Sequence, residues 1–320
     1  MSLLDLPVHP EQSPRLTSLQ GVRVREDTLY SNHRGAEKKG IRKRAETAIE
    51  KLQEVLRRAL GPEEAVLYVA RCQAPVGAFD QFTLGWYIYY VTGTILVFTN
   101  RRLLQFGVRR NGDWKQTLRT VSWGDMDGAQ VKGWLGPVLE LKYRSGKKEK
   151  YWNLRRDDAK KIKTLLSAIM SAGARETSGS QEMVTLCPFC LSELTPAVYQ
   201  CPKCRAAFKD EKTMLRRSWL IPGGGYFYTG HWFLAFGDFL VEAYLLVLLF
   251  VVLGFAVGFI RDTSSNPGET ALAGGEAWVA VGFVAAILVV EKLMTIHHCR
   301  RFIREFIPLG RERSQKALSG

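Results

Sequence analysis

The chain has 320 residues, of which 46% are hydrophobic, 24% are charged and six are cysteine, which excludes low-complexity disorder, a collagen-like repeat and a disulfide-dense miniprotein. Its 45 Lys and Arg against 31 Asp and Glu give a net charge of +14, but residues 232–320 hold eight basic and eight acidic side chains, so the whole excess lies in residues 1–231. A basic front part joined to an apolar rear part indicates a membrane surface or a polyanion as neighbour.

The N-terminal region has two parts. Its first residues contain no cationic start followed by an apolar stretch, so we expect no cleavable signal peptide and a front part that stays in the cytoplasm. Residues 1–35 carry three prolines without sustained periodicity, which predicts a disordered arm. From residue 36 to Gly61-Pro62, apolar residues recur every three or four positions between Lys and Arg. This predicts an amphipathic helix that packs on the next domain, with a helix lying on lipid as the alternative.

Residues 64–155 contain short β-branched and aromatic runs, separated by Gly, Asn and Ser at positions that suit hairpins. The pattern predicts one antiparallel meander. An apolar stripe over residues 157–170, with two aspartates in the first turn, predicts a helix that follows it. The predicted strands are residues 65–70, 82–91, 93–99, 103–107, 116–123, 129–133, 138–143 and 149–154.

One segment of the meander has a family resemblance. Thr92 to Leu104 reads TGTILVFTNRRLL, and Trp123 follows in VSWGDMDGAQV. The segment resembles the central hairpin of bacterial pleckstrin-homology (PH) and GRAM-like domains, which carry a similar TGxIxLTNRRL stretch. The resemblance covers about residues 62–172 and implies an antiparallel PH-like β-barrel with flanking helices. It also implies a binding platform for lipid headgroups or peptides, rather than a catalyst.

Four cysteines form two CxxC pairs, Cys187 with Cys190 and Cys201 with Cys204, separated by ten residues. In a reducing compartment this spacing indicates a metal site more often than disulfides, and four thiolates can complete a tetrahedron around structural Zn²⁺. The segment resembles a zinc ribbon. Iron in a rubredoxin-like site and a redox dithiol pair are the alternatives. Four thiolates leave no open position for water, so we expect the metal to fold the module and not to catalyse.

A glycine-rich segment precedes two apolar runs. Ile221 to His231 reads IPGGGYFYTGH, which resembles the PGxGxFYxG entry sequence of small bacterial two-helix membrane domains. Residues 212–218 are too polar for a further span. Whether residues 218–231 form a re-entrant turn or an interfacial helix therefore stays open.

The two apolar runs predict a transmembrane hairpin. Residues 243–260 are 18 uncharged residues, about 27 Å of helix, and residues 277–290 add 14 more. Arginines flank the outer ends of the pair, whereas the loop between the runs holds only Arg261. The positive-inside rule then puts both termini in the cytoplasm, for a multi-pass protein of the inner (cytoplasmic) membrane.

Two ionisable residues fall within the predicted spans. In an antiparallel hairpin the depths of Glu242 and Lys292 differ by about 4–5 Å, so we expect them to pair near the cytoplasmic boundary. Asp238 or Glu291 are competing partners.

Taken together, the patterns predict an α+β multidomain membrane protein. We expect no enzymatic activity, because the sequence offers no nucleophile with a base, no paired carboxylates and no open metal site. The predicted parts are a disordered arm (1–35), the N-terminal helix with the PH/GRAM-like domain (36–172), a flexible linker (173–184), the zinc ribbon (185–210), the glycine-rich entry with the two-helix membrane domain (211–304) and a basic tail (305–320).

The function expected is a cytoplasm-facing binding or scaffolding module that recognises anionic lipid headgroups or a protein partner. The candidate contacts are basic residues at or near predicted turns, which can equally be solvated hairpin charges: Arg101, Arg102, Arg109, Arg110, Lys147 and Lys148. A nucleic-acid-binding, membrane-tethered regulator is one alternative, disfavoured because the ribbon offers few aromatic residues for stacking. An assembly subunit of a larger membrane complex is the other.

Overall fold

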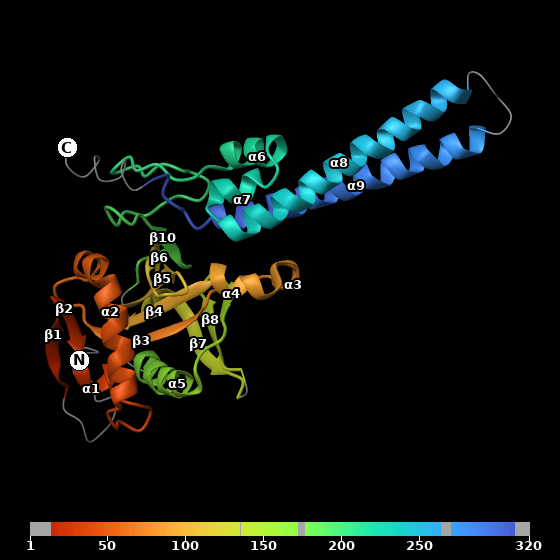
Figure 1. Cartoon of the computed structure of the whole chain (residues 1–320). Coiled ribbons are helices and arrows are strands. Elements are labelled where there is room, and N and C mark those ends of the chain that lie inside the picture. The colour runs from red at the N-terminus through yellow and green to blue at the C-terminus, as the bar shows by residue number, and fades with distance from the viewer. Residues whose placement is uncertain (1–13, 135, 172–176, 264–269, 311–320) are drawn as a thin grey trace. The chain divides into compact units, whose positions relative to one another are not determined.

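The computed structural model describes residues 14–134, 136–171, 177–263 and 270–310, and the side chains of residues 259–274 are not described (Figure 1). The fold is mixed α and β and divides into two units. Unit 1 comprises the described residues up to Arg205, and unit 2 comprises the described residues from Ala206 on.

The centre of unit 1 is a seven-stranded sheet with the order β1-β2-β3-β4-β5-β6-β10, in which only β2 and β3 pair in parallel. Strands β7, β8 and β9 form a separate antiparallel sheet. The strands are β1 (Leu16–Leu19), β2 (Val22–Arg25), β3 (Val66–Gln73), β4 (Gly93–Thr99), β5 (Arg102–Val108), β6 (Trp114–Ser122), β7 (Met126–Lys132), β8 (Val138–Tyr143), β9 (Lys148–Tyr151) and β10 (Val184–Leu186).

The closed β-barrel of the prediction is not formed, because the two sheets do not join into one. The 3-10 turn η2 (Trp123–Asp125) redirects the chain between β6 and β7. The free edge of β6 is then taken by β10, with Leu118 opposite Leu186. Seven strands thus form an open sheet with a smaller sheet beside it.

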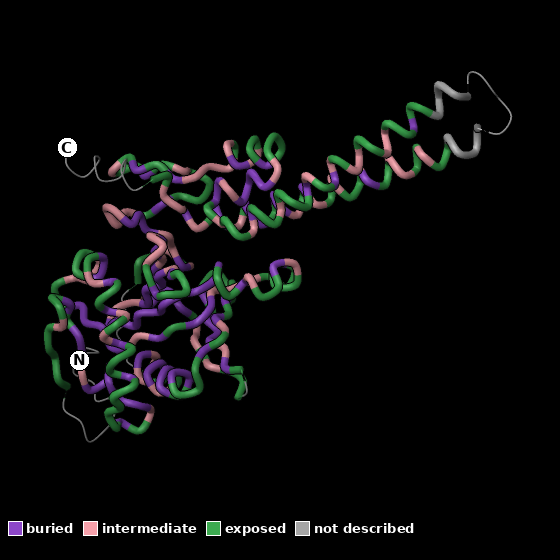
Figure 2. The backbone as a smooth tube through the Cα atoms, in the orientation of Figure 1, coloured by how far each residue is buried: buried purple, intermediate pink, exposed green. Residues whose placement is uncertain are grey.

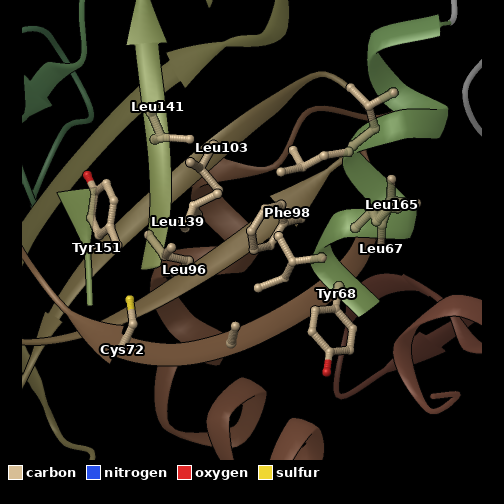
Figure 3. Close-up of a cluster of buried hydrophobic side chains, with 14 of the residues drawn as sticks. Leu67, Tyr68, Cys72, Leu96, Phe98, Leu103, Leu139, Leu141, Tyr151 and Leu165 are labelled. Carbon is tan, nitrogen blue, oxygen red and sulfur yellow. The ribbon is translucent and has the colours of Figure 1, made fainter. Parts of the chain in front are cut away.

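Helices and the second sheet cover the two faces of the large sheet. Along β4, Leu96 and Phe98 enter a core made with the second sheet and α5 (Arg156–Ser171), as Figure 3 shows, whereas Ile95 and Val97 enter a core made with α2 (Lys39–Ala59). Because both faces are covered, β4 is buried along its whole length, which explains its nearly continuous apolar sequence. The prediction that the amphipathic helix packs on the next domain is confirmed.

The prediction of a disordered arm is wrong for residues 16–29. They form β1, β2 and α1 (Glu26–Leu29), and Val22 and Val24 are completely buried in the core that the sheet makes with α2. Gln20 and Gly21, both at positive φ, make the two-residue turn between the strands. The alternation of Val and Arg from Val22 onward was the signal for this hairpin; residues 1–13 lie outside the described part.

The predicted strand over residues 82–91 is also wrong. The chain there forms two short helices, α3 (Ala78–Leu84) and α4 (Ile88–Val91), joined by the 3-10 turn η1 (Gly85–Tyr87). Strands β3 and β4 pair directly with each other, so the segment between them leaves the sheet. Gly85, at a φ of 50°, makes the break between α3 and α4.

The prediction of a flexible linker over residues 173–184 is wrong for residues 177–184, which the structure describes. The carboxylate of Asp125 accepts hydrogen bonds from the backbone N–H of Ser178 (2.8 Å) and of Gly179 (3.2 Å), and from the Ser178 hydroxyl. Residue 184 already belongs to β10. The segment from residue 177 is therefore tied to unit 1, and residues 172–176 lie outside the described part.

Unit 2 consists of α6 (Glu211–Leu220), α7 (Gly224–Thr229), α8 (Trp232–Thr263) and α9 (Thr270–Ile303). By length and composition, Trp232–Gly258 and Gly275–Ile303 can cross a membrane, and only 17% and 22% of their most apolar windows are buried. Figure 2 shows the exposed residues along both helices. Of the predicted basic tail, residues 311–320 lie outside the described part.

The glycine-rich entry forms the short helix α7. Gly223 precedes it at a φ of 66°, and a Cβ there would collide with the carbonyl oxygen of Ala235. A Cβ at Gly225 would collide with the Ser218 hydroxyl. The glycines therefore let α7 lie directly against α6 and α8.

Candidate functional site

The four cysteines converge on one point in unit 1. Their sulfurs lie within 4.8 Å of one another, with 3.6 Å between Cys187 and Cys204 and 3.5 Å between Cys190 and Cys201. Four sulfurs at about 2.3 Å from a tetrahedral ion are about 3.8 Å apart, whereas a disulfide needs about 2.05 Å. All four are free thiols, and the group could hold a metal ion.

Backbone hydrogen bonds act to lower the pKa of the first cysteine in each CxxC pair, and burial acts against them. The backbone N–H groups of Cys190 and Phe189 bond to Cys187, and those of Cys204 and Lys203 bond to Cys201. Burial raises the pKa of the Cys187 thiol. Burial also acts to raise the pKa of Cys201, but its hydrogen bonds outweigh it and lower that pKa to about 6.

The two CxxC turns have the same backbone form. The residue after each pair, Leu191 and Arg205, donates its N–H to the carbonyl of the first cysteine at 2.9 and 3.0 Å. Both residues are at positive φ, 62° and 57°, without being glycine. Such left-handed residues cost of order 1–3 kcal/mol and persist only where the surroundings enforce them. The repeated turn therefore presents two sulfur pairs to a common centre.

Two side chains that the sequence reading missed support this centre. The hydroxyl of Ser192 lies 3.0 Å from the Cys190 sulfur and 3.2 Å from the Cys201 sulfur. Arg58, on α2, donates to the carbonyls of Phe189 (2.9 Å) and Pro188 (3.2 Å). The serine two residues after a CxxC pair was a usable signal; Arg58, more than 120 residues upstream in the sequence, gave none.

The six candidate basic residues do not form one surface, because the β4–β5 and β5–β6 hairpins lie at opposite ends of β5. Arg102 forms a bidentate pair with Glu64, with both contacts at 2.9 Å. Arg101 pairs with Glu63 at 3.1 Å. Lys147, in the β8–β9 hairpin beside the exposed Lys148, pairs with Glu182 at 3.0 Å. These ion pairs join the β4–β5 turn to the segment before β3, and the β8–β9 turn to the segment before β10.

Arg109 and Arg110 are exposed at the β5–β6 turn. Arg71 donates to both of their carbonyls, at 3.2 and 2.7 Å. Arg110 donates to the hydroxyl of Tyr90 at 2.7 Å and lies over its ring at 5.4 Å from the centroid. This turn is therefore attached to α4.

The sequence also did not predict a partly buried ionic network between the two sheets. Arg119 contacts both oxygens of Glu149, at 2.8 and 3.3 Å, and the hydroxyls of Tyr143 and Tyr151 lie 2.9 and 3.0 Å from the same carboxylate. Burial acts to raise the pKa of Glu149, but Arg119 and these hydroxyls lower it below its ordinary value. The network joins β6 to β8 and β9.

In unit 2, Glu242 and Lys292 form an ion pair. The ammonium of Lys292 donates to the Glu242 carboxylate and, at 2.6 Å, to the carbonyl of Ser218 on α6. Glu242 is 0% exposed and Lys292 is 7% exposed. The contact expected from the antiparallel count is thus present, and it also links α6 to α8 and α9.

The competing partners lie beside this pair. Carboxylate oxygens of Asp238, Glu242 and Glu291 lie within 4.8 Å of one another. The hydroxyl of Thr295 is 2.9 Å from Asp238 and 3.1 Å from Glu291. The carboxylate that pairs with Lys292 is therefore one of a group of three.

Comparisons of the chain with protein-family models, with curated proteins and with solved structures found no match.

Proposed function

We propose that the chain is a two-pass membrane protein whose unit 1 is a non-enzymatic, zinc-bearing binding module on the cytoplasmic side. The exposure of large apolar side chains along α8 and α9 carries this proposal. Phe250 is 70% exposed, Val279 is 74% and Phe283 is 67%, whereas Glu242 is completely buried. This distribution is the opposite of that in a water-soluble protein, where apolar side chains are buried and charged ones are exposed. In lipid, apolar side chains face outward at no cost and charged groups face inward in pairs.

The flanking charges give the orientation. Arg216 and Arg217 precede α8, and Arg300, Arg301 and Arg304 lie at or just beyond the end of α9. The positive-inside rule then puts both termini in the cytoplasm of a bacterial cell, with the inner membrane as the site.

Zn²⁺ is the metal that the cysteine group fits best. The four sulfurs lie near tetrahedral spacing, and each CxxC turn directs backbone N–H groups at its first sulfur. Such a set of donors is typical of a structural zinc ribbon. The bound ion would cross-link the segment after β10 and so stabilise its fold. The four cysteines would fill its coordination shell.

Unit 1 is proposed to have a PH or GRAM-like fold that binds anionic lipid headgroups. Support comes from the antiparallel strands β3 to β9, from the helix α5 that follows them and from the TGTILVFTNRRLL hairpin at β4 and β5. Of the six candidate residues, Arg109, Arg110 and Lys148 are exposed, whereas Arg101, Arg102 and Lys147 are held in ion pairs.

The membrane proposal is tested by fractionating cells that express the full chain with a C-terminal fusion. Alkaline carbonate should leave the chain in the membrane pellet, a C-terminal green fluorescent protein should fluoresce, and a C-terminal alkaline phosphatase should be inactive. Phe250→Arg, which puts a charge near the middle of α8 at a cost of about 3 kcal/mol, should lower the membrane fraction, whereas Lys212→Gln should not. Release of the wild-type chain by carbonate would refute the proposal.

The metal proposal is tested by elemental analysis of the purified chain. We expect one zinc ion per chain in the wild type and none in Cys201→Ser. Cys299→Ala is the matched control, because Cys299 is a buried free thiol in unit 2, and it should keep the zinc. Iron in place of zinc would identify a rubredoxin-like site, and a metal-free wild type with disulfides would contradict the proposal.

A further inference from the structure

We propose that the exposed aromatic side chains between β3 and β4 form a membrane-inserting tip of unit 1, which enters the interface of an anionic bilayer. The inference rests on the proposed function, since the chain's own helix pair must hold unit 1 at that bilayer. The members of this aromatic tip are Phe79, Phe82, Trp86, Tyr89 and Tyr90.

Exposure sets the aromatic tip apart from the rest of unit 1. Phe82 is 87% exposed, Trp86 is 58% and Phe79 is 53%. In the described part of unit 1, five of the eight exposed large hydrophobic side chains fall within residues 79–90. Figure 1 shows α3 and α4 projecting from the sheet. Exposed apolar residues are normal when scattered singly, but a concentration of this kind marks an interaction surface.

The projecting segment is held firmly at its base. Ile88 and Val91 of α4 are buried, at 1% and 4% exposed. The hydroxyl of Thr92 lies 2.8 Å from the Gln73 side chain and 2.7 Å from the carbonyl of Ile88. The ring of Tyr89 packs edge-on against Trp152, with 5.1 Å between centroids. The aromatic tip is therefore presented by a fixed platform.

Charge favours an anionic bilayer as the occupant. The only charged residue between residues 76 and 92 is Asp80, which is 8% exposed. Basic side chains meet the segment at its base: Arg110 donates to the Tyr90 hydroxyl, and Lys115 donates to the carbonyl of Val91 at 2.7 Å. The segment thus has aromatic rings at its projecting end and basic side chains at its base. This order suits a bilayer interface, where the rings can enter the membrane while the basic side chains contact anionic headgroups.

Geometry and tethering favour lipid over a protein partner. A bilayer interface adapts to the shape of an inserted pair of short helices, whereas a protein partner would need a surface that matches it. The covalent link to the helix pair also keeps unit 1 near the same bilayer, so weak insertion of a few rings becomes effective.

The test uses the full chain, reconstituted in nanodiscs of phosphatidylglycerol and phosphatidylcholine, with the photo-cross-linking residue p-benzoylphenylalanine in place of Phe82. The matched control carries the same residue in place of Gln130, an exposed polar position on β7. Bound zinc and retention in the nanodisc report that both variants are folded and inserted.

We expect lipid adducts at position 82 and background yield at position 130. Nanodiscs of pure phosphatidylcholine should lower the yield at 82 about five-fold, the effect of roughly one basic side chain at an anionic surface. Arg110→Gln should lower the yield to a similar extent in the anionic nanodiscs.

Two outcomes would overturn the inference while leaving the proposed function intact. One is a chain that stays in the nanodisc but gives no more lipid adducts at position 82 than at position 130. The other is adducts to protein alone, which would make the aromatic tip a docking surface for a second copy or another protein. A chain that does not enter nanodiscs at all would refute the membrane proposal and the inference together.

Discussion

Replacing Lys292 by Met tests how much the ionic group between α8 and α9 contributes to unit 2. Met keeps most of the apolar stem of the side chain but removes the ammonium that donates to the Glu242 carboxylate and to the Ser218 carbonyl. A hydrogen bond to a charged group contributes about 1.5–3 kcal/mol, so losing two costs about 3–6 kcal/mol. Breaking a buried ion pair by removing one partner costs about 3–5 kcal/mol, and Glu242 is completely buried. We therefore expect a loss of about 3–5 kcal/mol.

Amide hydrogen exchange in detergent micelles measures this loss locally. A loss of about 3 kcal/mol corresponds to roughly 100-fold faster exchange through local opening, in peptides that cover Glu242 on α8 and Lys292 on α9. Peptides from β4 in unit 1 serve as an internal reference and should not change. Lys212→Met, an exposed lysine on α6, is the matched control and should leave exchange as in the wild type.

A double variant separates the ion pair from the rest of the group. In Glu242→Leu with Lys292→Met neither charge remains, so the loss should be well below the sum of the two single losses, with a coupling of about 2 kcal/mol or more. Wild-type exchange in Lys292→Met, or additive effects in the double variant, would refute the reasoning.

Two further predictions concern unit 1. Burial lowers the pKa of Lys161 from 10.5 to about 8, so between these pH values the unfolded chain binds more protons than the folded chain. Stability relative to Lys161→Met should then rise by about 2–3 kcal/mol from about pH 7.5 to pH 10 in thermal unfolding, and equal pH slopes would contradict this. Trp123 is 1% exposed and donates to the Thr99 carbonyl at 2.9 Å, so Trp123→Ala should cost about 3–5 kcal/mol in urea titration, with Trp123→Phe recovering more than half. A Trp123→Ala chain as stable as the wild type would show that this core tolerates the cavity.

Features encoded by local spacing were predictable. The amphipathic helix α2, the β4–β5 hairpin and the meeting of the four cysteines each follow from residues close together in the chain. The facing of Glu242 and Lys292 also followed, because two antiparallel helices with a fixed rise per residue leave little freedom in depth.

Features that depend on distant pairing were not predictable. In the open sheet the last strand is β10, which pairs with β6 although it lies more than 60 residues downstream. The sequence of β6 contains no local signal that indicates this pairing. The hairpin of β1 and β2 has only four residues per strand and depends on burying Val22 and Val24 in the core between the large sheet and α2. Its own pattern was therefore too short to outweigh three nearby prolines.

The failed strand prediction at residues 82–91 has a different cause. Aromatic and β-branched residues favour strands because they fit a half-buried, pleated surface, so their propensity reports packing more than backbone preference. Here the run WYIYYV forms helical turns in which Ile88 and Val91 are buried while Trp86 and Tyr89 are exposed. Places where local rules and the fold disagree tend to be functional. We propose that these aromatic rings obtain their apolar surroundings from a bilayer. The bilayer then provides the burial that the sequence pattern predicted a sheet would provide.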